Sequence, residues 1–547
     1  MAFAVNYLPS IVVLNILRYL SPEDRLRASA TCRTWRHCVF TRTHWPHKRF
    51  AVDVTDKRWT AVARHELRRN NRCNPTLDST PALKCFLSKC CRFLEELVIT
   101  FDPNSTASLR HLLDVIDILL SNDTNCNQNL STDGSVDDNQ WLRSNSRRLR
   151  RLTLNPINVT KSLEEFGSNE NDAHIYQLFQ QLVQRLDQLV DKCEPLEHIS
   201  FGCLQPVLNH SNRFLQTLAK RHSLSLKCLH LSSVKTDPDN YPVLDLSVHL
   251  LEPFASLRVL SIDFDVLNDQ MLRLMARKAT IDTFVVNVHG IDEQHEGLSA
   301  SSWSVLAKSN PNLKVTLNLI HTEDSIAVLR DSLLDTDMPL AHFRAYFVYT
   351  FGPSDDSICH LVNLVANRHS KTLLSVTLVN ALKGTKTRHQ RPNPVFAELR
   401  ENPLVMLAWR SRQLQSLTII GYEVCDSDLI AITRLRGSSL RHFSFPLCCI
   451  SLLHSPIAED EGYYDDYFDR RMTYFLDGAP QHIQTKVIED IAQPLDRRWT
   501  PLTYEQLPNA VTNSVNSMQT TYLSTILRDQ TICGESHHKI NATTDTN

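Results

Sequence analysis

Fifteen cysteines and 23 histidines, set among 60 acidic residues, are the side chains of this chain best suited to binding a metal or doing chemistry. Structural zinc sites need cysteines or histidines in closely spaced pairs, and no C-x-x-C pair occurs here. The sequence also has no G-x-S-x-G elbow, no glycine-rich phosphate loop ending in lysine, and no H-E-x-x-H motif. We therefore expect no catalysis, no metal and no cofactor, and we expect the chain to act by binding other proteins.

Composition limits the kinds of partner. The formal net charge is −2 and the isoelectric point is about 6.9, so no global field draws the chain to nucleic acid or to an anionic membrane. No segment approaches the roughly 18 apolar residues of a membrane-spanning helix. The cysteines are scattered and odd in number, which favours reduced, mostly buried thiols. We expect a protein of the cytoplasm, of the nucleus, or of both.

One apolar pattern, L-x-x-L-x-L with aliphatic or aromatic substitutes, recurs along the middle of the chain. Alternate residues of a β-strand point to opposite faces, so each copy predicts a strand with one face in the core. The central copies follow one another at about thirty residues, near the upper end of the leucine-rich-repeat range. The copies begin at Leu94, Leu149, Leu196, Leu226, Leu257, Ile281, Leu373, Leu414 and Leu440, with weaker copies at Leu313 and Leu340.

Segments with helical spacing separate these strands, for example 175–190 and 269–278. One strand and one helix cannot bury their shared apolar face alone, so the units are expected to stack into a curved solenoid. The predicted fold class is therefore α/β, with a strand and a helix in each degenerate leucine-rich repeat. An unrelated α/β domain with buried strands is the alternative.

The polar neighbours of the apolar strand positions would line the concave face of such a solenoid. They are the candidate surface for a target protein, because a solenoid of this kind presents its outward strand residues on that face. The candidate row consists of Arg151, Thr153, His198, Ser200, His230, Ser232, Ser261 and Asp263.

The first fifty residues form a separate apolar unit. Ser10 is expected to cap a helix over 11–19, which is apolar on almost every side. Ser21 and Pro22 mark the start of a second helix. A unit of about forty residues buries too little surface to be comfortable alone, so its surplus apolar face predicts a protein partner. An ordinary helical hairpin packed on the rest of the chain is the alternative.

This segment resembles the F-box family. In that family the leading Leu-Pro and the aliphatic face of the first helices insert into the adaptor Skp1. Ile11 departs from the family pattern, since many members carry glutamate there, and the change affects a peripheral contact more than the inserted face. The likeness rests on Leu8-Pro9, Ile16-Leu17, the run from Leu20 to Asp24, Leu26, the run from Cys32 to Arg36, and Trp45-Pro46, in matching order and spacing. The resemblance implies Skp1 contacts at Leu8, Pro9, Ile16, Leu17, Leu20 and Leu26, and a core of Cys32, Trp35 and Trp45.

Two windows, 24–30 and 401–443, closely resemble one F-box protein, and the residues between them resemble it diffusely. Within the second window we expect a short helix that presents Leu407 and Trp409 to the core. The predicted organisation is an F-box over 1–50, linker helices and a first repeat over 51–120, a disordered insertion over 121–147, the repeat solenoid over 148–450, a cap region with an acidic loop over 451–508, and a disordered tail over 509–547.

The resemblance implies a non-catalytic subunit of a Skp1–cullin–F-box ubiquitin ligase. The F-box would bind Skp1 and, through it, a cullin, while the repeats hold a target protein whose ubiquitination and degradation the complex promotes. Partners would carry out ubiquitin transfer, and this chain would set proximity. The alternative is a leucine-rich-repeat scaffold that acts without a cullin. No nucleic-acid or membrane partner is expected.

Overall fold

The computed structural model describes the chain in segments that its contacts divide into two compact units. The first unit comprises residues 1–236, 245–257 and 529–531, and the second comprises 237–244, 258–528 and 532–547. In the described part of the chain, no helix is both long and apolar enough to cross a bilayer. The described residues are 8–20, 22–29, 31–39, 49–55, 60–63, 84, 87–88, 91, 94–121, 149–159, 170–193, 195–234, 244–292, 294–322, 326–334, 337–348, 357–382, 391–397, 401–452, 475–512 and 518–531.

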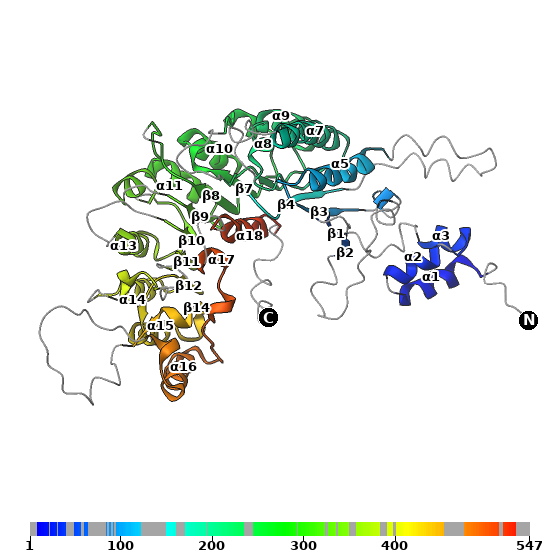
Figure 1. Ribbon diagram of the computed structural model, residues 1–547. Helices are drawn as coiled ribbons and strands as arrows, with labels where there is room; N and C mark the ends of the chain where they lie inside the picture. Colours follow the sequence, from blue (N-terminus) through cyan, green and yellow to red (C-terminus); the bar gives the residue numbers. More distant parts are fainter. Residues whose placement is uncertain are drawn as a thin grey trace, which may run out of the picture. The chain divides into compact units, whose positions relative to one another are not determined.

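Three short helices stand at the start of the first unit: α1 (Ser10–Tyr19), α2 (Pro22–Ser29) and α3 (Arg33–Val39). Pro22 is the first residue of α2, as the sequence predicted, because proline has no N–H to lose at a helix start. The predicted cap of α1 is wrong by one residue: Pro9 takes the N-cap position and Ser10 is already helical. Figure 1 shows the three helices packed on one another.

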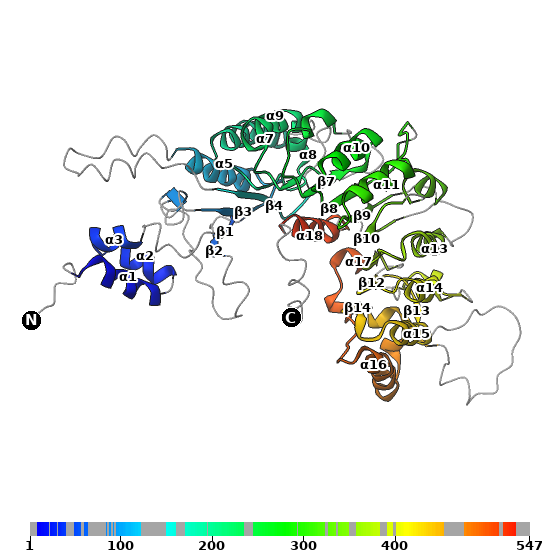
Figure 2. The same cartoon turned by 180° about the vertical axis from the view of Figure 1, so that it is seen from behind.

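A parallel sheet follows in the first unit, with helices on one of its faces (Figures 1 and 2). The pairing is parallel except between β1 and β2, where it is antiparallel. In sheet order the strands are β2 (Thr60–Ala63), β1 (Arg49–Asp53), β3 (Glu96–Phe101), β4 (Arg151–Pro156), β5 (His198–Ser200) and β6 (Cys228–His230). The helices are α5 (Thr106–Ser121), α7 (Glu170–Lys192), α8 (Gln205–Leu208) and α9 (Ser211–His222), with a 3-10 turn, η5 (Val248–Leu251).

The second unit repeats this strand-and-helix alternation, again with parallel pairing along its main sheet. Its strands are β7 (Val259–Asp263), β8 (Thr283–Val288), β9 (Lys314–Ile320), β10 (Leu340–Tyr346), β11 (Ser375–Val379), β12 (Ser416–Ile420) and β14 (His442–Ser444), with a small pair, β13 (Val424–Cys425) and β15 (Ile450–Ser451). Its helices are α10 (Asp269–Lys278), α11 (Ala300–Ser309), α12 (Ile326–Leu329), α13 (Ser357–His369), α14 (Pro403–Arg410), α15 (Asp426–Arg436), α16 (Gln481–Leu495), α17 (Asn509–Thr512) and α18 (Met518–Thr531), the last three residues of α18 being counted with the first unit. Short turns complete it: η6 (Phe264–Val266), η7 (Arg330–Leu334), η8 (Pro394–Phe396), η9 (Gly437–Ser439), η10 (Leu447–Cys449), η11 (Leu476–Gly478) and η12 (Tyr504–Gln506).

The apolar pattern of the sequence corresponds directly to the core. Every predicted L-x-x-L-x-L copy, including the weaker ones at Leu313 and Leu340, falls on a strand. The motif residues also meet one another in register, as Leu152 does with Ile199, and Ile199 with Leu229. These side chains are buried, so stacking of like positions covers the face that one repeat leaves open. The predicted α/β fold with a strand and a helix in each leucine-rich-repeat-like unit is confirmed.

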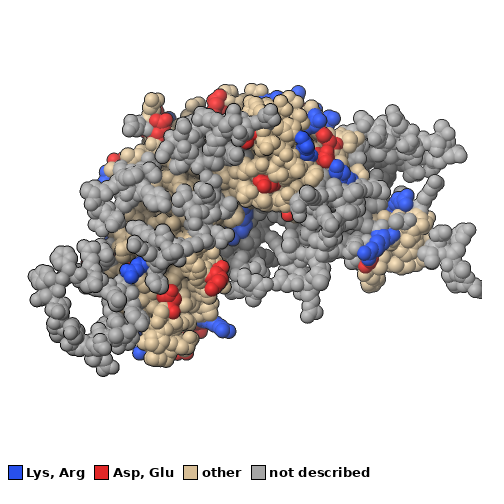
Figure 3. Space-filling model, viewed as in Figure 1, with Lys and Arg blue, Asp and Glu red and all other residues tan. Residues whose placement is uncertain are grey.

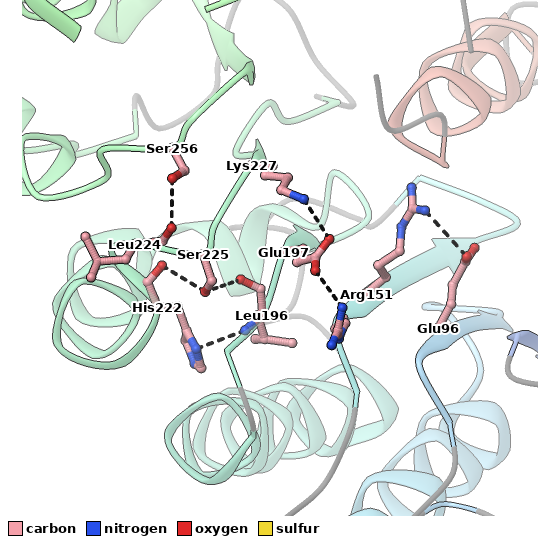
Figure 4. Close-up of polar contacts among 10 residues, drawn as sticks. Glu96, Arg151, Leu196, Glu197, His222, Leu224, Ser225, Lys227 and Ser256 are labelled. Carbon is pink, nitrogen blue, oxygen red and sulfur yellow. Dashed lines mark hydrogen bonds and ion pairs between the residues drawn. The ribbon is translucent and has the colours of Figure 1, made fainter. Parts of the chain in front are cut away.

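Polar side chains between helix end and strand start repeat as well. In the first unit, His222 Nδ1 accepts a hydrogen bond from the Leu196 N–H (3.1 Å), and Ser225 Oγ donates to the Leu196 carbonyl (2.7 Å). Figure 4 shows these contacts beside the bond from Ser256 to the Leu224 carbonyl. They satisfy buried main-chain groups that no strand ladder reaches, and they fix each turn of the array to the next.

Some expectations from the sequence are wrong. Residues 509–512 and 518–531, predicted as disordered tail, are helices α17 and α18. The range 51–120, predicted as linker helices and a first repeat, contains the strand β2 as well as the strand β3 and the helix α5. Trp409 is 58% exposed, although Leu407 is buried as predicted, because α14 turns only one face to the core. Cys228 is disulfide-bonded, so the expectation of reduced thiols does not hold for it.

The predicted disordered insertion lies almost entirely outside the described residues, apart from Ser121 at the end of α5. The acidic loop at 459–469 also lies outside them. Within the predicted cap region, the helix expected near 483–491 is α16, which buries Val487, Ile491 and Leu495.

Candidate functional site

Helix α1 has one buried and one exposed apolar face. Val13 and Leu17, one helical turn apart, are buried inside the three-helix unit. The exposed face carries large apolar side chains that lie next to one another at helical spacing, and a small helical unit has little else to cover them. They are Ile11 (69% exposed), Val12 (38%), Ile16 (37%) and Tyr19 (91%). We call these four residues the α1 face.

The residues predicted to bind Skp1 are placed unevenly. Pro9 is exposed, while Leu8 and Leu20 are half-buried. Ile16 lies on the α1 face, but Leu17 is buried against the unit's own core and offers little surface. The side chain of Leu26 lies outside the described residues. The sequence could not assign these roles, because in a helix that is apolar on all sides the residue types do not show which side is buried.

The predicted core residues of this unit are only partly described. Cys32 and Trp35 are half-buried, and Cys32 Sγ accepts a hydrogen bond from the Trp35 main-chain N–H (3.5 Å). The Trp35 indole Nε1 is buried without a hydrogen-bond partner. Trp45 lies outside the described residues.

The candidate target row on the strands is not an open surface. Arg151 keeps partial exposure and reaches the buried carboxylate of Glu96, at 3.8 Å (Figure 4). The expectation that the row is exposed is therefore wrong, although its role in target binding stays a prediction. The other members, each at most 2% exposed, are Thr153, His198, Ser200, His230, Ser232, Ser261 and Asp263.

The last turn of α18 contacts part of this row within the first unit. The Gln530 amide oxygen accepts a hydrogen bond from Ser200 Oγ (2.6 Å). Its amide nitrogen donates to Ser232 Oγ and to Cys203 Sγ, both at 3.2 Å. All four side chains are buried. This helix was predicted as disordered because the segment is rich in serine and threonine. Its buried residues nevertheless recur at helical spacing, at 522, 523, 526, 527 and 530.

Histidines of the row lie in a dry environment. Thr153 Oγ1 and His198 Nε2 are 3.1 Å apart, and the His198 and His230 ring centroids are 5.2 Å apart. Neither ring nitrogen of His230 has a hydrogen-bond partner. Burial disfavours the charged imidazolium and lowers the pKa of His230 to about 3, against a smaller opposing effect of Asp529. His230 is therefore neutral at physiological pH.

The second unit buries an aromatic side chain of α18, Tyr522. The Tyr522 ring lies edge-on to His321, with centroids 5.6 Å apart, and 5.9 Å from the Tyr346 ring. The Tyr522 hydroxyl is buried without a hydrogen-bond partner, and burial raises the pKa of this phenol. Burial lowers the pKa of His321 to about 4.

Charged residues of the first unit pair along its helices. Arg213 reaches Asp187 (2.7 Å) and Arg221 reaches Asp191 (3.2 Å), which joins α9 to α7. Figure 3 shows basic and acidic side chains next to one another in this region. Such pairing leaves no large single-sign field there to attract a charged polymer. Within the described ranges, no group of three or more His, Cys, Asp and Glu residues is placed to hold a metal ion.

Comparison with known proteins agrees with the helical unit at the start of the chain. A family model described as F-box-like matches residues 5–51. F-box only protein 33 of Homo sapiens is 24% identical over 474 residues, which cover 79% of this chain and 75% of that protein. The Mus musculus protein of the same name is 24% identical over 472 residues, with the same coverage.

Among solved structures, one described as "Crystal structure of TLR13-ssRNA13 complex" is 13% identical, with a TM-score of 0.26. The likeness covers 68% of this chain and 52% of that one, and it supports no conclusion about function. The family match and the two relatives carry the assignment. Residues 5–51 match the F-box-like family, the chain is similar to F-box only protein 33, and leucine-rich-repeat-like strands and helices follow the matched segment.

Proposed function

We propose that this chain is the substrate-recognition subunit of a Skp1–cullin–F-box ubiquitin ligase. The α1 face binds Skp1, the repeats hold a target protein, and the complex brings the target to the ubiquitin-transferring partners. The chain itself supplies proximity and orientation, not chemistry.

The observation that carries this proposal is the α1 face within the segment that matches the F-box-like family. Ile11 and Tyr19 are among the most exposed large apolar side chains of the described residues. Leaving a cluster of this kind in water forgoes about 25 cal/mol for each Å² that a partner would cover. An apolar face on a small surface unit is typical of a protein-binding site.

Variants of α1 test the proposal against recombinant Skp1. Ile16→Glu places a charge in the centre of the α1 face, and we expect Skp1 affinity to fall more than tenfold, which corresponds to at least about 1.4 kcal/mol. The matched control is Ser10→Glu, which adds the same charge at an exposed residue of the same helix outside the α1 face. An acid is favourable in the first turn of a helix, so affinity should change less than threefold.

An equal loss of Skp1 affinity in both variants would show that binding does not depend on the α1 face as proposed. No measurable binding of wild-type chain to Skp1 would remove the proposal altogether. Circular dichroism of each variant separates a binding defect from unfolding, since Ser10 and Ile16 are both exposed.

A further inference from the structure

Basic side chains gather where the helices α14 and α15 of the second unit end. The two helices pack against each other and lie side by side (Figures 1 and 2). Their ends coincide, because Nη1 of Arg436, in the last turn of α15, donates a hydrogen bond to the carbonyl of Ser411, the residue after α14 (3.3 Å). Arg412 follows Ser411, and its charge acts on Arg436. The basic side chains at these two helix ends are Arg410, Arg412, Arg434 and Arg436.

The charges of these four arginines are not neutralised by acidic residues. Among the described residues, none of the four forms an ion pair with a carboxylate, and Asp496, at the end of the neighbouring helix α16, is not bonded to them. Basic residues are favourable at the end of a helix, but each helix end carries only about half a negative charge. The two ends together therefore offset about one of the four positive charges.

Arg436 is the half-buried member of this group, and its surroundings are unfavourable. Its Nε is buried and has no hydrogen-bond partner. Burial lowers the pKa of Arg436, and the nearby charge of Arg412 lowers it further. The described residues thus leave Arg436 without an opposite charge. A carboxylate from a partner, placed beside Arg412 and Arg436, would supply one.

Exposed apolar side chains lie among these charges. Trp409, directly before Arg410 in the last turn of α14, is 58% exposed. Leu435, between Arg434 and Arg436 in the last turn of α15, is 36% exposed. Tryptophan and arginine are enriched among the residues that carry binding energy at protein interfaces. The two helix ends therefore combine an anion-binding surface with an apolar contact.

We propose that this surface docks an acidic segment of the target protein, in which aspartate or glutamate residues flank an aromatic or aliphatic side chain. The carboxylates pair with the arginines, and the apolar side chain packs on Trp409 and Leu435. This inference rests on the proposed function, because it specifies which part of the repeats holds the target. We call the surface the arginine edge, and its residues are Trp409, Arg410, Arg412, Arg434, Leu435 and Arg436.

The side chains of the arginine edge favour a protein segment over a nucleic acid. Single-stranded nucleic acid is bound by a basic groove along its backbone together with several aromatic side chains on which successive bases stack. The arginine edge has one aromatic side chain, Trp409. A guanidinium group, by contrast, matches a carboxylate with two N–H donors for two oxygens. An acidic peptide therefore fits this surface better than a chain of bases.

Fluorescence anisotropy with the full-length chain tests the proposal at about 0.15 M salt, where weak long-range attraction is screened. The probe is a labelled synthetic peptide in which glutamates and aspartates surround one phenylalanine and one leucine. Arg434→Glu should weaken its binding at least tenfold, because like charges then face each other. The matched control is Arg277→Glu, which reverses an exposed arginine in the last turn of α10 in the same unit. That change should alter the affinity less than twofold.

The apolar contact has a test of its own. Trp409→Ala should weaken binding of the same peptide at least threefold, because the exposed indole is no longer there to be covered. It should leave nearly unchanged the binding of a second peptide, in which serines replace the phenylalanine and the leucine. Val305→Ala, which shortens an exposed side chain of α11, is the control and should affect neither peptide.

The proposal is overturned if the acidic peptide does not bind wild-type chain, or if Arg434→Glu and Arg277→Glu lose equal affinity. It is also overturned if a labelled oligodeoxythymidylate of the same charge binds as tightly and is weakened equally by Arg434→Glu, since the occupant would then be a nucleic acid. Circular dichroism shows whether each variant folds. If Arg434→Glu does not, Arg434→Gln removes the charge without placing an acid at a helix end, and it should weaken peptide binding about threefold.

Skp1 binding, measured on the same preparations, separates the two proposals. Peptide binding at the arginine edge without Skp1 binding would defeat the proposed function alone. Skp1 binding without peptide binding would defeat this inference alone.

Discussion

The α1 face and a strand row of the first unit differ in exposure and in polarity. We use strand row for the buried members of the candidate target row in that unit, Thr153, His198, Ser200, His230 and Ser232. The α1 face is apolar and exposed, with Tyr19 91% exposed. The strand row is polar and buried, and residue 530 of the same chain bonds to it. An apolar surface left in water indicates a partner from outside, whereas a polar surface closed by the chain itself indicates an internal partner. The contrast shows that residue type alone does not tell which surface is free.

The largest expected effect tests the buried side of this contrast. Leu226 is fully buried two residues before β6, while Leu224, two residues earlier, is 78% exposed. Leu226→Ala should lower the free energy of unfolding by about 2–5 kcal/mol, because it opens a cavity. Leu224→Ala should change it by less than about 0.5 kcal/mol. Denaturant titrations that give equal losses for the two variants would contradict the described packing.

A second prediction concerns acid. The pKa of His230 is about 3 in the folded chain and about 6.5 when exposed, so the unfolded state binds more protons between these values. Stability should therefore be unaffected above pH 6.5 and fall as the pH drops below it. At pH 5 the loss from this one residue is about 2 kcal/mol.

His230→Phe should remove that share of the acid sensitivity, measured as the difference in unfolding midpoint between pH 7.5 and pH 5. His482→Gln, an exposed change on α16, is the control and should leave the difference intact. Some sensitivity remains in His230→Phe, because burial also lowers the pKa of His222, His321 and His369. An unaltered pH difference in His230→Phe would mean that His230 is not buried as described.

The two sides of α1 sharpen the comparison at smaller scale. Val13→Ala removes a buried side chain. It should lower the free energy of unfolding of the F-box-like unit by roughly 1–2 kcal/mol, and with it the unfolding temperature. Ile16→Ala removes partly exposed surface and should instead weaken Skp1 binding by about 1 kcal/mol, with little change in unfolding temperature. Calorimetry and a Skp1 titration on both variants would reveal a wrongly assigned face if the two effects were exchanged.

The smallest effect is expected at surface charge pairs. Arg221 and Asp191 are both about half exposed, at 52% and 45% of their side chains. Arg221→Ala should cost less than about 1 kcal/mol of stability, and the difference should shrink further in 1 M salt. A loss above about 2 kcal/mol in thermal unfolding would show that these pairs, and not the leucine core, hold α9 to α7.

The strands were predictable from the sequence because their leucines recur at fixed spacing and a strand has only two faces. Which side of α1 is buried was not predictable, since Leu17 and Ile16 are similar apolar residues in a helix that is apolar on almost every side. Helix α18 was missed because serine, threonine and glutamine mask its apolar face. The hydrogen bond between Ser200 and Gln530 joins residues 330 positions apart. A local sequence pattern cannot predict a contact at that separation.

The most direct test of the central claim is co-purification of a cullin with the full-length chain in the presence of Skp1. The proposed function predicts that wild-type and Ser10→Glu chains recover both Skp1 and cullin, whereas Ile16→Glu recovers neither. Recovery of Skp1 with no cullin, under conditions that preserve the Skp1 contact, would contradict it and favour a scaffold that acts outside the ligase.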